Sequence, residues 1–275
     1  MELFDSHAHY DDEKFNEDRD EIIEKIYSSG VTKFMCAGYN LESSLNGIKL
    51  ADKYDYIYTT SGISPNDVNT TIEETKKNIV QLRKNIIDYK DRQKKENKID
   101  KIVGIGEIGL DYYWNAKNKN VQNFAFIEQI KLANELNLPI VIHTREAVMD
   151  TLNILKQNPV NRKGVFHCCP FNRELVKEAL KLGFYISIAG TVTFKNAKNA
   201  KEIIEMIPLN RLLIETDSPY LAPEPVRGIR NDSRNVKYIA EKIAEFKNMQ
   251  AEEIAKITYE NAKTIFKICI SREKQ

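Results

Sequence analysis

The chain of 275 residues has little cysteine (four residues), a single tryptophan and no long uninterrupted apolar run. Four cysteines in a chain of this length exclude the dense disulfide framework of a small secreted domain. A membrane-spanning helix needs about 18 successive apolar residues, and no segment approaches that length. Charge of one sign is also lacking, since 41 Lys and Arg oppose 40 Asp and Glu. This balance disfavours a protein that coats nucleic acid.

The first residues of the chain carry acidic side chains and no apolar core, so no signal peptide is expected. Cys168 and Cys169 are adjacent, a spacing that fits neither a CxxC redox motif nor a zinc motif. We therefore expect a cytoplasmic protein that does not associate with membranes. No heptad pattern or exposed apolar stripe is evident, so a monomer without an obligate protein partner is expected.

Short apolar runs, often β-branched, alternate with longer helical patterns along the chain. Runs typical of strands are Glu2–Asp5, Val31–Ala37, Tyr56–Ser61, Lys101–Gly106, Pro139–His143, Lys163–Cys168, Gly183–Ala189 and Arg211–Thr216. Helical spacing occurs in Phe15–Ser28, Ala125–Leu136, Leu175–Leu182, Ala197–Ile207, Val236–Phe246 and Ala251–Ile268. Strands that alternate with helices indicate parallel pairing through right-handed crossovers. Eight such units predict a closed, eight-stranded (β/α)8 TIM barrel, as a single domain over residues 1–275, with the last two helices closing it. An open doubly wound sheet is the alternative.

The segment Gly104–Gly109 matches the G-x-G-x-x-G pattern of dinucleotide-binding sites. In those sites a helix begins within the motif and faces the pyrophosphate. Here the residues that follow are typical of a loop, and Glu107 would place a carboxylate against a phosphate. We therefore expect the glycines to allow close approach of the backbone at a strand end.

A basic stretch, Lys76–Lys101, contains ten basic and four acidic residues. The region that contains it, Thr71–Lys101, is longer than a single crossover helix requires. Such a stretch is usually a solvated helix face, and the alternative is a patch that attracts phosphate.

The four histidines occupy positions that predict one metal centre. Each of them lies at or just beyond the carboxyl end of a predicted strand, as do two acids: His7, His9, Glu107, His143, His167 and Asp217. Barrel enzymes keep their active sites at that end. His7 and His9 are two residues apart, so on a strand their side chains share a face. A lone histidine is more often structural, but the joint placement favours a common centre.

This ligand set suits a pair of divalent ions. Imidazole nitrogens and carboxylate oxygens are ligands for Zn²⁺ and similar metals. Six ligands exceed the need of one tetrahedral catalytic ion, whereas two ions about 3.5–4 Å apart and bridged by a carboxylate would use them all. Glu107 is the expected bridge because it lies midway in the ligand order. The chain has no G-x-S-x-G element that would indicate a serine nucleophile.

Several motifs resemble those of the TatD family of metal-dependent deoxyribonucleases, in the amidohydrolase-like barrel superfamily. The most specific are GEIGLDYY at residues 106–113 and ETDSPYLAP at residues 215–223. Less specific matches are FDSHAH at 4–9, LPIVIHTR at 138–145, VFHC at 165–168, GFYIS at 183–187 and PVRGIRN at 225–231. The resemblance runs from about residue 3 to about residue 267. It implies His7, His9 and Asp217 on one metal, His143 and His167 on the other, and Glu107 as the bridge.

Two segments depart from the family pattern. Ser64 precedes Pro65 where the family usually has a histidine, and Asn66 follows where a second is common, which affects expected contacts with substrate. Residues 169–171 read Cys-Pro-Phe in place of the usual Phe-Ser-Gly, beside His167. Neither departure removes an expected metal ligand.

The resemblance implies hydrolysis of DNA, as a 3'-5' exonuclease that prefers single strands. We expect Asp217 to accept the proton of the attacking water, with Glu107 as the second catalytic residue and two ions of Zn²⁺, Mg²⁺ or Mn²⁺. Expected substrate contacts are Tyr112, Tyr113, Arg145, Arg227 and Arg230. Aromatic rings stack on unpaired bases, and guanidinium groups match phosphate oxygens. Arg227 and Arg230 could equally pair with surface acids, and at least one of the aromatic residues 112–114 is expected in the core.

Three other functions stay open at this point. A small-molecule amidohydrolase or lactonase could use the same barrel and metals, although it would usually carry a carboxylated lysine where Glu107 stands. An aminoacyl-tRNA deacylase is a second alternative. A non-catalytic nucleic-acid-binding protein is the third, but it would not need a complete set of six ligands.

Overall fold

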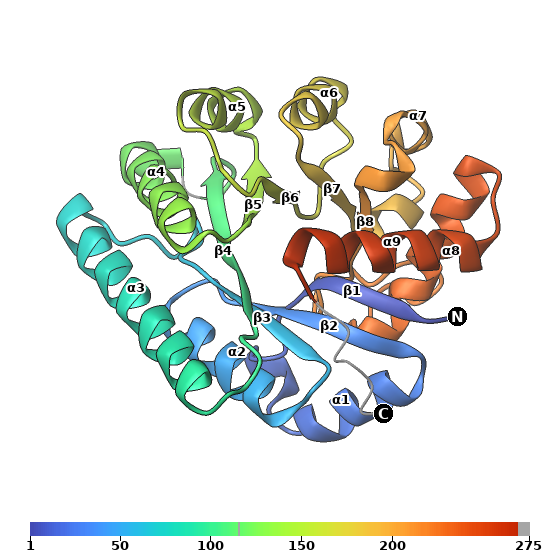
Figure 1. Cartoon of the computed structure of the whole chain (residues 1–275). Coiled ribbons are helices and arrows are strands. Elements are labelled where there is room, and N and C mark those ends of the chain that lie inside the picture. The colour runs from blue at the N-terminus through green and yellow to red at the C-terminus, as the bar shows by residue number, and fades with distance from the viewer. Residues whose placement is uncertain (115, 269–275) are drawn as a thin grey trace.

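The computed structural model describes residues 1–114 and 116–268. Its eight parallel strands follow one another in chain order around a barrel (Figure 1). They are β1 (Leu3–Ala8), β2 (Val31–Ala37), β3 (Ile57–Ser61), β4 (Ile102–Asp111), β5 (Ile140–Arg145), β6 (Gly164–Phe166), β7 (Tyr185–Ile188) and β8 (Leu212–Ile214). An isolated parallel bridge between Ala8 and Ser218 joins the two ends of the sheet. The predicted (β/α)8 barrel is confirmed, and the alternative of an open doubly wound sheet is wrong. Residues 269–275 of the predicted 1–275 domain lie outside the described residues.

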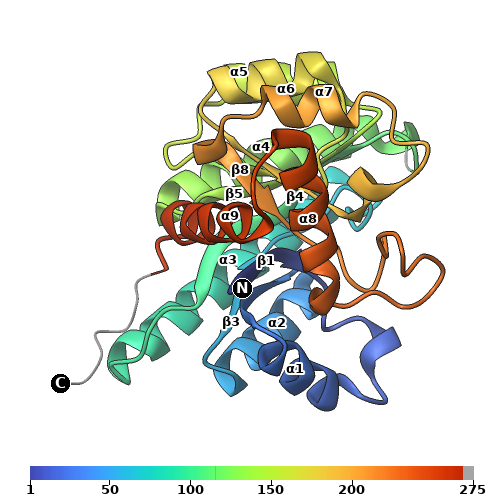
Figure 2. The same ribbon diagram turned by 90° about the vertical axis from the view of Figure 1, so that its right-hand side faces the viewer.

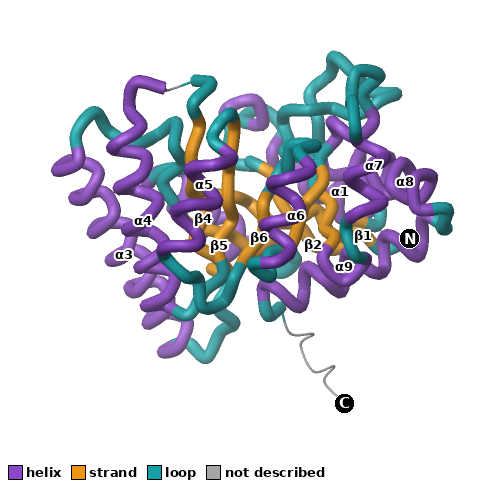
Figure 3. Tube along the Cα trace, turned by 90° about the horizontal axis from the view of Figure 1, so that it is seen from above, coloured by secondary structure: helices purple, strands orange, loops and turns teal. Residues whose placement is uncertain are grey.

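Helices lie outside the strands, as the view from above shows (Figure 3). They are α1 (Arg19–Ser28), α2 (Leu41–Lys53), α3 (Ile72–Lys95), α4 (Lys119–Leu136), α5 (Val148–Gln157), α6 (Arg173–Lys181), α7 (Ala200–Met206), α8 (Val236–Lys247) and α9 (Ala251–Phe266). Short 3₁₀ turns occur at Glu13–Phe15, Ala116–Asn118, Gly190–Thr193, Leu209–Arg211 and Ser233–Asn235. Polar side chains cap several helices: Asn40, Thr71 and Asn172 each accept a backbone N–H of the first turn.

Helix α9 closes the amino-terminal end of the barrel. One residue from each strand joins a hydrophobic cluster with α9, namely Phe4, Met35, Tyr58, Val103, Val141, Val165, Tyr185 and Leu213. The helix contributes Tyr259, Ala262, Ile265 and Phe266 to this cluster, and Figures 1 and 2 show it crossing the barrel. The opposite end, where the strands terminate, is therefore the end that stays available for a site.

The fourth strand is longer than predicted. β4 continues through Leu110 to Asp111, which pairs in parallel register with Arg145 of β5, so the predicted loop is wrong at these two residues. The cause is the buried amide of Gln122. It accepts the backbone N–H of Asp111 at 2.9 Å and donates to its carbonyl at 3.0 Å, and so replaces a neighbouring strand as hydrogen-bond partner.

The glycines of the G-x-G-x-x-G segment lie within β4, and no helix begins there. A Cβ on Gly106 would lie 2.6 Å from the Cβ of Val141, and one on Gly109 would lie 2.0 Å from the carbonyl oxygen of His143. The glycines thus allow β4 and β5 to approach closely, as the sequence analysis predicted.

The basic stretch covers all but the first turn of α3, a helix of 24 residues, and the turn that follows it. In the part of the chain that the structure describes, six of its bases pair with acids: Arg83 with Glu135, Lys84 with Asp88, Lys90 with Asp100, Arg92 with Asp52, Lys98 with Glu96 and Lys101 with Asp55. This agrees with a solvated helix face. Among the described residues, no helix combines the length and hydropathy that a bilayer span requires.

Candidate metal centre

The carboxyl ends of the strands bring all six predicted ligands together. His7 lies in β1, Glu107 in β4 and His143 in β5, whereas His9, His167 and Asp217 follow β1, β6 and β8. In the first cluster, the Nε2 atoms of His7 and His9 are 3.2 Å apart. Asp217 Oδ1 lies 3.3 Å from His9 Nε2, and Glu107 Oε2 lies 3.3 Å from His7 Nε2.

The second cluster shares Glu107 with the first. His143 Nδ1 and His167 Nε2 are 3.2 Å apart. Glu107 Oε1 lies 3.0 Å from His143 Nδ1 and 3.5 Å from His167 Nε2. The two oxygens of Glu107 therefore face different histidine pairs.

The backbone turns sharply at two positions where predicted ligands follow the strands. Cys168 and Asp217 have φ angles of 40° and 57°, in the left-handed region that non-glycine residues seldom adopt. Asp217 also donates its backbone N–H to the carbonyl of His7 at 2.9 Å. This bond ties the chain after β8 to β1 and places the carboxylate of Asp217 beside His9.

Neighbouring acceptors determine which ring nitrogen faces the centre. The carbonyl of Ala37 lies 3.0 Å from His9 Nδ1, and Asp111 Oδ2 lies 2.9 Å from His143 Nε2. A carbonyl and an ionised carboxylate only accept hydrogen bonds, so these two nitrogens carry the hydrogens. In the neutral imidazoles, the lone pairs of His9 Nε2 and His143 Nδ1 therefore face the centre, as metal ligation requires.

Two buried carboxylates at the centre, Asp111 and Glu215, are absent from the predicted site. Glu215 Oε1 lies 3.3 Å from His167 Nδ1 and accepts the backbone N–H of Cys168 at 2.6 Å, so it orients His167. Their spacing from two of the predicted ligands could have indicated both residues in the sequence. Asp111 stands four residues after Glu107 and Glu215 two before Asp217, and alternate residues of an extended chain share a face.

The charges of the centre depend strongly on one another. Burial would raise the pKa of Glu107, but the imidazoles of His167, His143 and His7 outweigh it and hold that pKa well below its ordinary value. Burial likewise lowers the pKa of His9, yet Asp217 and Glu107 raise it to about 9. The buried carboxylates create a strongly negative potential, and this potential favours the protonated form of the imidazoles. The same potential favours a metal cation.

The donor set fits divalent metal ions. Among the described residues, three groups of side chains have ligand atoms within 4.8 Å of one another. One group is His7, His9 and Asp217, and another is Glu107, His143 and His167. Imidazole lone pairs that converge at about 3.2 Å are favourable only when they share a proton or a cation. Mixed nitrogen and oxygen ligands suit Zn²⁺ and Mn²⁺, and the carboxylates also suit Mg²⁺.

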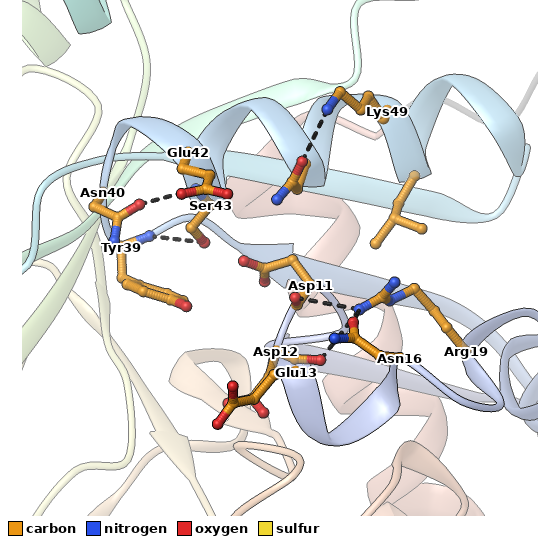
Figure 4. A pocket seen from close by; sticks show the side chains of 12 residues that line it. Asp11, Asp12, Glu13, Asn16, Arg19, Tyr39, Asn40, Glu42, Ser43 and Lys49 are labelled. Atoms are coloured by element: carbon orange, nitrogen blue, oxygen red, sulfur yellow. Dashed lines mark hydrogen bonds between the residues drawn. The ribbon is translucent and has the colours of Figure 1, made fainter.

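A groove of about 550 Å³ lies between the segments that follow β1 and β2 (Figure 4). Its lining includes four carboxylates, from Asp11, Asp12, Glu13 and Glu42, and two basic side chains, from Arg19 and Lys49. Arg19 donates to the backbone carbonyls of Tyr10, Asp11 and Asp12, so its donors are engaged by the protein. The ring of Tyr39 separates the groove from His9, with centroids 5.5 Å apart. The groove is acidic and disfavours phosphate.

A family model described as TatD related DNase matches residues 4–267. The chain belongs to this family. The uncharacterized metal-dependent hydrolase YabD of Bacillus subtilis (strain 168) is 42% identical over 267 residues, which are 97% of this chain and 99% of that protein. The 3'-5' ssDNA/RNA exonuclease TatD of Escherichia fergusonii is 30% identical over 272 residues, 97% of this chain and 99% of that protein. The crystal structure of YjjV, a TatD homologue from Escherichia coli K12, has a TM-score of 0.85 at 25% identity and covers 97% of this chain and 98% of that one. This TatD-family protein is thus a metal-dependent hydrolase.

The predicted substrate contacts of the TatD-family chain lie in different surroundings. Tyr112 is half-buried and packs against the hydrophobic core, as expected for at least one of the aromatic residues 112–114. Its hydroxyl donates a hydrogen bond to Asp150 at 2.8 Å. Arg230 forms an ion pair with Asp18, in line with the surface alternative. Arg227 lies over the ring of Phe194, 3.8 Å from its centroid. Tyr113 and Arg145 are exposed.

The departures from the family pattern lie close to the centre without entering it. Asn66 donates its side-chain amide to Asp111 Oδ2 at 3.3 Å, and therefore contacts the carboxylate that orients His143. Ser64 donates to Asp67 at 2.6 Å. In the second segment Cys169 is buried, and its backbone N–H bonds to the carbonyl of Ser187 at 3.0 Å.

We expect the substitution Asp111→Asn to weaken metal binding about 10- to 100-fold, which is typical of partners that orient metal-ligating histidines. Asp111 Oδ1 accepts the N–H groups of Tyr113 and Trp114, at 2.9 Å each, so the amide oxygen of Asn would stay there. Its NH₂ group would then face His143 Nε2. Two donors cannot bond, so the hydrogen of His143 would move to Nδ1, the nitrogen that faces the centre.

Metal affinity measured by competition with a chromogenic chelator checks this result. Asp67→Asn is the matched control, because Asp67 is the nearby acid that accepts from Ser64 and does not contact a histidine of the centre. An Asp111→Asn protein that folds normally and keeps its full affinity would contradict the orienting role.

Proposed function

We propose that this TatD-family hydrolase cleaves the phosphodiester bonds of single-stranded DNA from the 3' end, using two divalent ions. The observation that carries the proposal is the placement of Glu107, whose oxygens face two separate histidine pairs at 3.3 Å and 3.0 Å. A shared carboxylate between two clusters is typical of sites that hold ions about 3.5–4 Å apart and act on phosphate esters. The name of the 3'-5' ssDNA/RNA exonuclease relative supports the choice of substrate and polarity.

In this proposal His7, His9 and Asp217 hold one ion, His143 and His167 hold the other, and Glu107 lies between them. Divalent ions bound here would supply Lewis acidity, which lowers the pKa of water and neutralises charge on the phosphoryl oxygens. The identity of the ions is proposed to be Zn²⁺, Mg²⁺ or Mn²⁺, because the ligands suit all three.

The chain's own proton acceptor is Asp217. Burial raises the pKa of its carboxyl group, but His9, His167 and His7 lower it below the ordinary value, so the group is ionised at neutral pH. Its side chain is 16% exposed, against 9% for Glu107, and it can therefore pass a proton to solvent. Water attacks phosphorus, its proton goes to Asp217, and the bond from phosphorus to the leaving oxygen breaks. The leaving oxygen takes a proton from solvent and departs as a hydroxyl group. All four histidines face the clusters, which leaves none of them for this task.

We further propose that the protein acts in the cytoplasm and as a monomer. Three described cysteines, Cys36, Cys168 and Cys169, carry free thiols, and Cys168 directly follows the proposed ligand His167. Free thiols beside a metal centre are compatible with a reducing compartment.

A substrate panel tests the proposed function. End-labelled single-stranded DNA, RNA, and a set of amide and lactone substrates are incubated with Mg²⁺, Mn²⁺ or Zn²⁺. We expect a ladder of DNA products that shortens from the 3' end. Removal of metal by a chelator should abolish it, and re-addition of a divalent ion should restore it. Turnover of amides or lactones without cleavage of nucleic acid would contradict the proposal.

A further inference from the structure

Three side chains form an exposed aromatic and cationic surface at the carboxyl ends of β4 and β5, which we call the platform: Tyr113, Trp114 and Arg145. Tyr113 is 50% exposed and Trp114 is 68% exposed. Their rings meet edge to face with centroids 4.7 Å apart. The guanidinium of Arg145 lies 3.9 Å from the ring centroid of Tyr113 and 5.4 Å from that of Trp114. Large aromatic side chains left open to solvent in one patch indicate a contact site.

The platform is attached to the metal centre through a single carboxylate. Asp111 Oδ1 accepts the backbone N–H groups of Tyr113 and Trp114, and Asp111 Oδ2 bonds to His143 Nε2 at 2.9 Å. Arg145 stands two residues after His143 on the same strand. A ligand that lies on the platform is therefore held at a defined position relative to His143.

Arg145 is free to bind an anion. Among residues 1–114 and 116–268, none forms an ion pair or a side-chain hydrogen bond with its guanidinium, which is held by the two rings alone. Arg230 differs, because its guanidinium pairs with Asp18. A guanidinium that stacks on rings still presents its N–H edge to phosphate oxygens.

The charge around the centre favours one direction for a polyanion. On the side of β1 and β2, the groove of Figure 4 has four carboxylates, and the donors of Arg19 are engaged by backbone carbonyls. On the side of β4 and β5, the platform offers an unpaired cation and two exposed rings. A nucleic-acid strand that reaches the centre should therefore extend over the platform.

We propose that the platform is the subsite for an unpaired base next to the scissile phosphodiester, with the base stacked on Trp114 and Tyr113 and the adjoining phosphate bound by Arg145. The inference rests on the proposed nuclease function and adds to it the side chains that would hold an unpaired base beside the centre. Stacking on side chains requires an exposed base face, and a base within a duplex is covered by its neighbours.

A kinetic comparison tests the platform. Trp114→Ala and Arg145→Ala are compared with wild type on a single-stranded oligonucleotide and on methyl p-nitrophenyl phosphate, a diester without a nucleobase. We expect kcat/KM for the oligonucleotide, relative to that for the small diester, to fall about tenfold through KM, since base stacking contributes strongly to such complexes. Tyr27→Ala is the matched control, because Tyr27 is also exposed and stacks on another ring, that of Tyr56. It should leave this ratio unchanged.

Fluorescence gives a second readout that does not depend on turnover. Trp114 is the only tryptophan of the chain, so intrinsic tryptophan emission reports on the platform alone. Oligothymidylate added to the Asp217→Asn protein should quench this emission, and a blunt duplex of equal length should not. In Arg145→Ala, the slope of log affinity against log salt concentration should be smaller by about 0.7, the value for one phosphate contact on a single strand.

The two proposals fail in different ways. An unchanged kinetic ratio together with unquenched emission would overturn the platform and leave the nuclease function standing. Absence of hydrolysis of both the oligonucleotide and the small diester by the wild-type protein would overturn the nuclease function, and quenching by oligothymidylate would still support the platform as a binding site.

Discussion

Replacing Asp217 by Asn should remove nearly all hydrolysis while the metal stays bound. Asn has the shape of Asp and keeps an oxygen that can ligate beside His9, where Asp217 Oδ1 lies 3.3 Å from Nε2. An amide cannot accept the proton of the attacking water at neutral pH. General-base catalysis contributes about 10²- to 10⁴-fold to rates, so we expect a loss of that size. Turnover of the small diester and metal content measured on the same preparation check the result.

A neighbouring acid provides the control for Asp217. Asp12→Asn makes the same chemical change within the acidic groove, where the carboxylate accepts from the hydroxyl of Tyr220 at 2.7 Å and is not part of a ligand cluster. Its hydrolysis should stay close to that of wild type. Near-normal turnover by Asp217→Asn would instead assign the proton to another acceptor.

Glu107→Gln should lose both metal and activity. The carboxylate is buried, with 9% of its side chain exposed, and each oxygen faces a histidine pair. Gln has one side-chain oxygen, so its NH₂ group must face one of the two clusters. An NH₂ group is a hydrogen-bond donor and cannot ligate a cation. Loss of charge neutralisation worth several kcal/mol in the transition state corresponds to a rate decrease on the order of 10³-fold or more.

Metal stoichiometry separates this effect from that of Asp217. Metal analysis of Glu107→Gln should find fewer ions per chain than in wild type, whereas Asp217→Asn should not lose any. Glu135→Gln is a suitable control, because Glu135 is a surface acid paired with Arg83. If Glu107→Gln kept the metal content and the turnover of wild type, Glu107 could not be a bridge between two ions.

The barrel was predictable because its signals are local and repeated. Buried parallel strands read as apolar runs, and each is followed by a helix whose apolar face recurs at helical spacing. The convergence of the six proposed ligands was predictable for a related reason. Parallel strands in a barrel all end on the same side, so histidines and acids at successive strand ends must converge. His7, His143 and His167 are far apart in the chain, yet each position could be assigned from its own strand.

The ends of the strands and the contacts of individual side chains were less predictable. The extension of β4 to Asp111 depends on the amide of Gln122 from α4, a contact that no local pattern encodes. The chemically similar Arg145 and Arg230 could not be told apart in sequence. Only the fold brings Asp18 to Arg230 and the ring of Tyr113 to Arg145. Spacing does not report such contacts, because they depend on side-chain direction and on elements distant in the chain.

The sequence by itself determined the barrel and the convergence of six histidine and acidic side chains at one end of it, since periodicity and strand ends follow from local residue order. The tertiary structure alone decided how these groups face one another. It turned the two oxygens of Glu107 toward different histidine pairs and placed Asp111 and Glu215 behind His143 and His167. It also set an acidic groove and the platform on different sides of the centre. Those features arise from packing between distant segments, where distances of a few ångströms decide which lone pair, hydrogen or charge faces the site.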